Sequence, residues 1–448
     1  MLERGRIAET NRNVYQAQRP AERAAAGLGD TAALRSIFVI RTAPSSLMVA
    51  QNMSSSIMGS LDSGDSEVQM TGYEQIKKVL SSRPKNWAIT GVAGFIGSHL
   101  LERLLLLDQK VVGLDNFETG HAENLDEVRA SVGEERWTNF QLLEGDVREP
   151  ASCAQVCEGA DFVLHQAALG SVPRSIAKPG LVHENNVTGF VNMLLAARDA
   201  GPKRFVFASS SAVYGDSPEL PRVEEKIGRQ LSPYAATKAI NESYADLFAR
   251  VYGMPYVGLR YFNVFGPRQD PAGPYAAVIP KWTSALLRDE TIWINGDGET
   301  SRDFCFVQDV VQANLLAATT TNPEATGHCY NIAAGERTTL NQLFAILRSS
   351  VEAAGATVAS RDPAYQPFRA GDIRHSLADI SKARRLLGYE PQYTLRQGLE
   401  QTLDWYGRLT AALRPSCEPG LPELRANGGS AHVAKRPSAT KAPSFGVT

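Results

Sequence analysis

A tyrosine and a lysine stand four residues apart in the segment SPYAATK, at Tyr234 and Lys238. On a helix, positions i and i+4 lie on one face, one turn apart. A phenol with an ordinary pKa of about 10 is a poor base at neutral pH, and a neighbouring ammonium group stabilises its phenolate. Lowering that pKa by about three units requires roughly 4 kcal/mol. The pair therefore predicts a tyrosine general base, although this spacing alone is common by chance.

Three serines, Ser209, Ser210 and Ser211, follow an apolar segment at 204–208 that reads as a strand. In an open parallel sheet, ligands bind beyond the carboxyl ends of the strands. Hydroxyl groups at this place are therefore expected to face a substrate. A plain polar loop is the alternative interpretation.

A glycine-rich turn follows another predicted strand, in the stretch NWAITGVAGFIG from Asn86 to Gly97. Glycines allow a tight turn and let a pyrophosphate approach the bare backbone, and the next helix offers its N-terminal N–H groups. Asp115 ends the following strand, where a carboxylate accepts hydrogen bonds from an adenosine ribose. Because that carboxylate repels a 2′-phosphate, NAD is favoured over NADP. A purely structural turn is the alternative.

These residues need a scaffold, and the chain supplies strands and helices in alternation. Strands are predicted at 87–90, 111–114, 139–143, 162–165, 204–208 and 256–260, after a short helix from Tyr73 to Leu80. This alternation of strands and helices predicts an α/β fold with a Rossmann-like doubly wound parallel sheet and a smaller C-terminal substrate-binding lobe. We expect an NAD-binding domain mainly in 71–275 and the lobe mainly in 276–410. Residues 1–70 and 411–448 are predicted to be disordered. For residues 1–70, a start codon assigned too far upstream is an equally consistent interpretation.

Composition narrows the class of protein. The 448 residues are 43% hydrophobic and 21% charged with a net charge of −2, which is ordinary for a globular enzyme and favours neither nucleic acid nor a membrane as partner. No apolar run approaches the roughly 18 residues of a membrane span. The five cysteines do not have the spacing of a redox pair or a metal site, so we expect reduced thiols, no metal and a cytoplasmic location.

Several sequence segments together resemble those of a known family: TGVAGFIGSHLLE, HQAALGSVPRS, GLRYFNVFGPRQDP and INGDGETSRDFC. They resemble the extended short-chain dehydrogenase/reductases of the NAD-dependent epimerase/dehydratase family. The resemblance covers roughly Tyr73 to Thr410 and is closest to the UDP-N-acetylglucosamine 4-epimerases of bacterial polysaccharide synthesis. It implies that Tyr234 takes the proton of the sugar 4-hydroxyl while hydride passes from C4 to tightly bound NAD. Ser210 would bond the reacting oxygen, and Lys238 would hold the nicotinamide ribose.

The resemblance and the strand-end positions together give a set of expected contacts. The expected cofactor-binding residues are Gly91, Gly94, Phe95, Ile96, Gly97, Asp115, Asn116, Thr119, Gly120, Asp146, Val147, Gln166, Ala167, Ala168, Tyr234 and Lys238. The expected substrate-binding residues are Ser171, Arg174, Ser209, Ser210, Ser211, Tyr234, Asn263, Val278, Arg302, Arg369, Asp372 and Ser376. For Asp146, a solvated turn aspartate is the alternative to an adenine contact.

At some positions this sequence differs from related enzyme families, and these differences reduce the number of reactions that the chain is expected to catalyse. Sugar 4,6-dehydratases carry an Asp-Glu pair where this chain has Ser211 and Ala212, which argues against dehydration. Ser376 stands where simple UDP-galactose 4-epimerases carry a bulky tyrosine, so a small side chain would leave room for a 2-acetamido group. UDP-N-acetylglucosaminuronate and UDP-glucose/UDP-galactose remain alternative substrates, and a non-catalytic NAD-binding scaffold is the alternative class. Segments 183–200 and 235–252 are expected to form a homodimer interface, although core burial would explain their apolar faces equally well.

Overall fold

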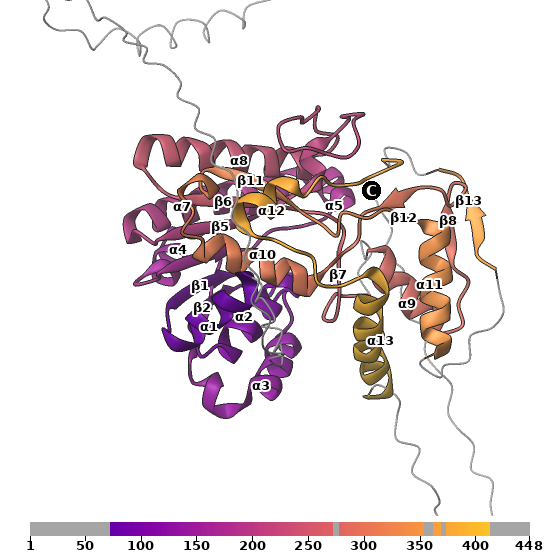
Figure 1. The fold of residues 1–448 in the computed structure, drawn as a ribbon, viewed down its shortest axis with the longest axis horizontal. Coiled ribbons are helices and arrows are strands. Elements are labelled where there is room, and N and C mark those ends of the chain that lie inside the picture. The colour runs from indigo at the N-terminus through magenta and orange to yellow at the C-terminus, as the bar shows by residue number, and fades with distance from the viewer. Residues whose placement is uncertain (1–71, 272–276, 354–361, 369–372, 413–448) are drawn as a thin grey trace, which may run out of the picture. The chain divides into compact units, whose positions relative to one another are not determined.

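A computed structural model describes residues 72–271, 277–353, 362–368 and 373–412. Its centre is a parallel sheet of seven strands in the order β11-β6-β5-β4-β1-β2-β3 (Figure 1). The strands of this sheet are β1 (Asn86–Thr90), β2 (Lys110–Asp115), β3 (Phe140–Glu144), β4 (Phe162–His165), β5 (Arg204–Ser210), β6 (Tyr256–Tyr261) and β11 (His328–Ile332). The doubly wound parallel sheet predicted from the sequence is confirmed.

Helices cover both faces of this sheet, because successive strand residues point to opposite faces and both carry apolar side chains. On one face, Trp87 and Ile89 of β1 share a core with α2 (Phe95–Leu106), α3 (Ala122–Trp137) and α10 (Val307–Thr319). On the other face, Ala88 shares a core with α4 (Pro150–Cys157), α7 (Gly189–Ala200) and α8 (Pro233–Tyr252). Such two-sided burial is typical of parallel sheets.

The direction of strand order reverses between β1 and β4. The chain runs from β1 through β2 to β3 on one side, and then returns to place β4 on the other side of β1. A crevice opens beyond the strand ends at such a reversal, and ligands bind there. The glycine-rich turn after β1 and the loop after β4 both lie at this point.

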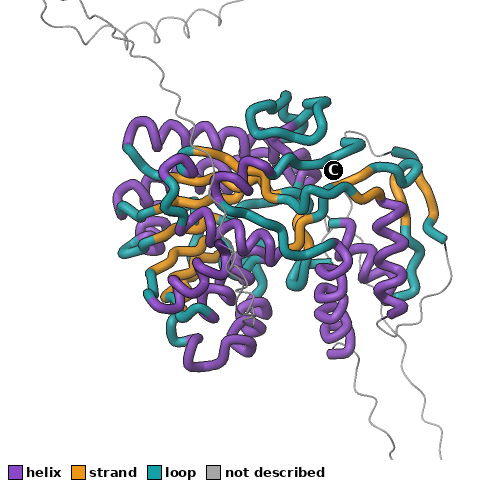
Figure 2. The backbone as a smooth tube through the Cα atoms, in the orientation of Figure 1, coloured by secondary structure: helices purple, strands orange, loops and turns teal. Residues whose placement is uncertain are grey.

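The second half of the chain divides its elements between the sheet and a separate lobe. The lobe core contains α9 (Val278–Leu287), α11 (Leu340–Ala353), α13 (Leu395–Ala412) and β8 (Trp293–Asn295), which pairs with β13 (Ala364–Gln366). Figure 1 shows these helices beside one another, and Figure 2 shows the loops that lead to them. Two further short pairs connect lobe and sheet segments: β7 (Val264–Phe265) with β10 (Cys305–Phe306), and β9 (Ser301–Arg302) with β12 (Thr338–Thr339).

One strand of the sheet was not predicted. β11 follows the first lobe elements and pairs with β6, while α10 and α12 (Ser381–Leu387) pack in the sheet core. The remaining elements are α1 (Gly72–Ser82), α5 (Val172–Ala177), α6 (Pro179–His183), β7 and three short turns of helix, Glu184–Thr188, Ser211–Tyr214 and Pro323–Ala325. The segment 276–410 therefore builds the lobe and also completes the sheet.

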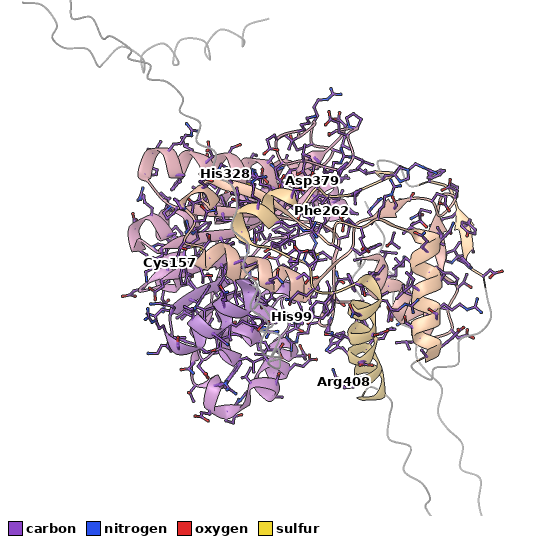
Figure 3. The ribbon with its side chains drawn as sticks, viewed as in Figure 1. His99, Cys157, Phe262, His328, Asp379 and Arg408 are labelled. Carbon is purple, nitrogen blue, oxygen red and sulfur yellow. The ribbon has the colours of Figure 1, made fainter. Side chains whose placement is uncertain are left out.

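The described residues contain neither a candidate membrane span nor a cluster of metal-ligating side chains. None of the helices placed in the structure is long and apolar enough to cross a membrane. No group of three or more His, Cys, Asp or Glu side chains in the described ranges is arranged to hold a metal ion. The labelled His99, Cys157 and His328 in Figure 3 come from three separate elements, α2, α4 and β11. The cysteines within these ranges are unpaired thiols.

Candidate active site

The glycine-rich turn is packed so closely that side chains are excluded. Gly91 has φ of 70°, and a Cβ there would lie 2.9 Å from the backbone N of Ala167, which follows β4. A Cβ on Gly97 would lie 2.0 Å from the carbonyl oxygen of Gly91. Gly94 is the N-cap of α2 and has no side chain to cap it, so Phe95, Ile96 and Gly97 present their N–H groups at the helix start. The turn fits a pyrophosphate.

Asp115 lies beside this turn with its side chain buried. Its carboxylate accepts hydrogen bonds from the backbone N–H groups of Ala93 (2.8 Å) and Phe117 (2.9 Å), and burial raises its pKa. Each carboxylate oxygen has a second lone pair, so Asp115 retains the capacity to accept from a ribose. A Cβ on Gly120 would lie 2.8 Å from the same carboxylate. Thr119, the residue before it, is exposed.

Asp146 and Asn116 meet at the next strand end, and Arg148 joins them. The Asn116 amide donates to Asp146 (2.7 Å), and the Arg148 guanidinium donates to both oxygens of the Asp146 carboxylate (2.9 and 2.6 Å). These bonds lower the pKa of Asp146 to about 2. Sequence reasoning missed Arg148, because its pairing two residues from Asp146 has no distinctive spacing. Val147 is buried between them.

The loop after β4 is tied to both halves of the sheet. Ala167 donates its N–H to the Thr90 hydroxyl (3.3 Å), and Gln166 bonds with both Asn314 (3.0 Å) and Tyr261 (3.1 Å). Ala168 is partly buried in the same loop. This places the predicted residues 166–168 directly across from the glycine-rich turn.

Ser210, Tyr234 and Lys238 come together where β5 ends and α8 begins. Burial raises the pKa of Tyr234 above its ordinary value, and a hydrogen bond with Ser210 partly offsets this rise. Lys238 is buried and donates its ammonium group to the carbonyl of Ala208 (2.8 Å). Burial lowers the pKa of Lys238 to about 8. The structure thus brings together the three residues predicted to be catalytic.

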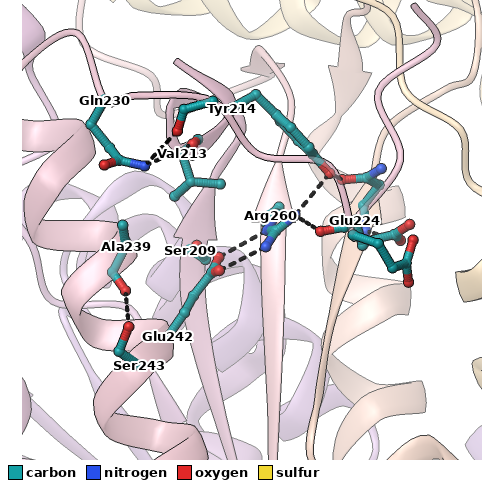
Figure 4. Close-up of polar contacts among 12 residues, drawn as sticks. Ser209, Val213, Tyr214, Glu224, Gln230, Ala239, Glu242, Ser243 and Arg260 are labelled. Carbon is teal, nitrogen blue, oxygen red and sulfur yellow. Dashed lines mark hydrogen bonds and ion pairs between the residues drawn. The ribbon is translucent and has the colours of Figure 1, made fainter. Parts of the chain in front are cut away.

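Ser209, also predicted as a substrate contact, is bonded on the other face of β5. β5 continues to Ser210 rather than ending at 208, so neighbouring serines point to opposite faces. The Ser209 hydroxyl donates to Glu242 (2.5 Å), and Glu242 pairs with both ends of the Arg260 guanidinium (2.9 and 2.8 Å), as Figure 4 shows. Ser209 therefore has a structural contact. Ser211 opens the short helical turn that Ser210 caps.

The same buried network continues to Tyr214, as Figure 4 also shows. Arg260 donates to the Tyr214 hydroxyl (3.0 Å), which itself donates to Asn331 of β11 (2.6 Å). Only 1% of Tyr214 is exposed. This tyrosine of the serine loop therefore stabilises the sheet through its bonds with Arg260 and Asn331. None of this network was predicted, because its members are far apart in sequence.

A cavity of about 1160 Å³ lies in the lobe and contains three of the predicted substrate residues. Asn263, Val278 and Arg302 all line it, together with Trp282 and Trp293. Ser210, Tyr234 and Lys238 are not among its lining residues. Three residues predicted to bind substrate thus line one cavity, to which Val172 and Pro173 of α5 also contribute.

The other predicted substrate residues are placed as follows. Ser171 caps α5 by accepting from the N–H of Arg174 (3.1 Å), and Val172 and Pro173 between them line the cavity. Ser376 donates its N–H to the carbonyl of Ser301 (3.1 Å), so it runs beside β9. The predicted contacts Arg369 and Asp372 fall outside the described residues.

Comparison with known proteins agrees with this geometry. The profile of the NAD dependent epimerase/dehydratase family matches residues 87–333. A UDP-glucose 4-epimerase of Mycolicibacterium smegmatis is 36% identical over 320 residues, which are 71% of this chain and 97% of that protein. A UDP-glucuronate 4-epimerase of Thermodesulfobacterium geofontis is 31% identical over 323 residues, covering 71% and 95%.

A solved structure is similar as well. It is the UDP-N-acetylglucosamine 4-epimerase from Methanobrevibacter ruminantium in complex with UDP-N-acetylmuramic acid, with a TM-score of 0.66 and 39% identity over 73% of this chain and 99% of that one. The chain therefore belongs to the NAD-dependent epimerase/dehydratase family. Within it, the chain falls with the nucleotide-sugar 4-epimerases, and its cofactor is NAD.

Proposed function

We propose that this protein interconverts UDP-N-acetylglucosamine and UDP-N-acetylgalactosamine by inverting C4. The observation that carries the proposal is the meeting of Ser210, Tyr234 and Lys238 at the end of β5. When bound, NAD would supply the redox chemistry at C4, and the glycine-rich turn and Asp115 would hold it. Tyr234 removes the proton of the 4-hydroxyl and later returns it.

Each of the other two residues has a defined task. The Ser210 hydroxyl holds the reacting oxygen beside the phenol, and its bond with Tyr234 partly offsets the rise in the pKa of that phenol caused by burial. Lys238 keeps an ammonium group on the same helix face as Tyr234, which stabilises the phenolate. Its own bond to the Ala208 carbonyl fixes that ammonium group at the sheet.

Two features support this reaction and are compatible with this sugar. No carboxyl group stands at Ser211 or Ala212, so the chain lacks an acid there for dehydration. A serine at 376 occupies less volume than the tyrosine of simple UDP-galactose 4-epimerases, which permits a 2-acetamido group but does not exclude a hydroxyl. The similar UDP-N-acetylglucosamine 4-epimerase structure supports this choice.

UDP-sugars with a 6-carboxylate are the second candidate substrates. The relative from Thermodesulfobacterium geofontis is named for UDP-glucuronate, and Arg174 follows two residues that line the lobe cavity. An arginine suits a carboxylate through bidentate hydrogen bonds. Incubating the purified chain with each UDP-sugar and observing the C4 configuration by NMR tests the proposal, and a lack of inversion of UDP-N-acetylglucosamine refutes it.

We also propose that two copies associate through α7 and α8. These neighbouring helices expose Leu195, Tyr244, Leu247, Val251 and Tyr252, with exposed fractions from 37% to 58%. Apolar side chains gathered on two adjacent helices are suited to a partner of the same kind, since a four-helix contact would remove them from water.

A further inference from the structure

Asp303, between β9 and β10, is a fully buried acid with an unusual set of partners. Its carboxylate accepts from the backbone N–H groups of Ala334 (3.0 Å), Gly335 (3.2 Å) and Ala378 (3.2 Å). None of its surface is exposed, and burial raises its pKa to about 7 against the opposing effect of these bonds. One side chain thus joins three segments that are distant in sequence.

Residues expected to bind the substrate lie next to Asp303 and near one of the segments that its carboxylate joins. The Asn263 side chain donates to the main-chain oxygen of Asp303 (2.9 Å), and Arg302 is the preceding residue. Both Asn263 and Arg302 line the lobe cavity. Ser376 lies two residues before Ala378 and donates its N–H to Ser301 (3.1 Å).

We propose that Asp303 is a positioning residue that gathers the UDP-binding segments of the lobe into one site. This inference rests on the proposed function and takes Asn263 and Arg302, which line the lobe cavity, as contacts of the UDP portion of the substrate. Without a carboxylate acceptor, buried N–H groups would lose their partner, and the loops that carry them would separate. The guanidinium group of Arg302 would then no longer be held in position to donate its N–H groups to a phosphate.

The Asp303→Asn variant tests this with little change in volume. An amide has one accepting oxygen, and its NH₂ group faces an N–H donor that the carboxylate had satisfied. We expect the Kd for UDP, measured by calorimetry, to rise about tenfold. The KM for the UDP-sugar should rise similarly while kcat stays near its wild-type value, because Ser210, Tyr234 and Lys238 are on other elements.

Asp309→Asn is the matched control. Asp309 of α10 is also buried, 1% exposed, and accepts from the N–H of Gln392 (2.8 Å), so it does not join the segments that Asp303 holds. This variant should alter thermal stability and leave the Kd for UDP unchanged. The inference is overturned if folded Asp303→Asn binds UDP as tightly as the wild type, or if Asp309→Asn weakens UDP binding equally.

Hydrogen exchange of the wild-type chain provides a second test that does not depend on the variant folding. Binding of UDP should slow exchange at the amides of Ala334, Gly335 and Ala378 together, since they share one acceptor. Unchanged exchange at all three overturns the inference. UDP binding does not require turnover, so a chain that binds UDP in this manner but inverts no sugar would refute the proposed function alone.

Discussion

Replacing Tyr234 with phenylalanine removes the proposed base while keeping the ring that packs at the start of α8. A positioned acid–base group contributes about 10²- to 10⁴-fold to rate, which is about 3 to 5 kcal/mol of activation free energy. We therefore expect kcat for UDP-N-acetylglucosamine to fall by that factor. Bound NAD should remain, because the glycine-rich turn and Asp115 are untouched. The lost bond to Ser210 should change the unfolding free energy by about 1 kcal/mol or less.

Tyr214→Phe is the control for the loss of a buried tyrosine hydroxyl. That hydroxyl bonds with Asn331 (2.6 Å) and Arg260 (3.0 Å), so its removal leaves a buried charged donor short of one partner. The expected cost is about 1–3 kcal/mol of stability, with kcat near the wild-type value. Turnover by NMR, NAD content after denaturation and thermal unfolding would be measured on both variants. A Tyr234→Phe enzyme with near-normal kcat would refute its role as the base.

Further predictions address the cofactor, the sugar, the pH dependence and the dimer. Gly91→Ala should lose bound NAD, because φ of 70° and the tight contact both oppose a Cβ, whereas Gly159→Ala, at φ of 67° with no neighbour within 4 Å, should retain it. Ser376→Tyr should reduce turnover of UDP-N-acetylglucosamine far more than of UDP-glucose, and equal losses would contradict the steric argument. Since burial lowers the pKa of Lys238 to about 8, kcat/KM should decline as pH rises past that value and the ammonium group is lost; a continuing rise in a pH–rate profile would count against it. Leu247→Arg, at a side chain 41% exposed, should give a folded monomer in light scattering, and an unchanged mass would exclude the α7–α8 interface.

The fold and the reactive group were predictable because their signals are local. The Gly91 turn, the alternation of strands and the spacing of Tyr234 and Lys238 are each contained within a short window of sequence. β11 was not predicted, because it pairs with β6 only after the chain has left the sheet to build lobe elements. A short apolar run within a segment that lacks strict alternation gives little indication of its partner.

The strand end at the site and the residues that were missed there have a related cause. Ser209 was grouped with Ser210 because the strand was predicted to end at residue 208, two residues before its observed end. Successive side chains of a strand point to opposite faces of the sheet, so the two hydroxyl groups face different sides. Glu242 and Asp303 were missed because their partners lie far away in sequence: Arg260 for one, and the amides of 334, 335 and 378 for the other. Buried polar networks of this kind become visible only when the chain is folded.

The most direct test of the account is the fate of C4 in UDP-N-acetylglucosamine. The purified full chain, carrying its bound NAD, would be incubated with this sugar, and proton NMR would distinguish the two configurations at C4. The account predicts that UDP-N-acetylgalactosamine appears without added cofactor until both sugars are at equilibrium. No inversion of the sugar by NAD-containing protein, or inversion of UDP-glucuronate alone, would contradict it.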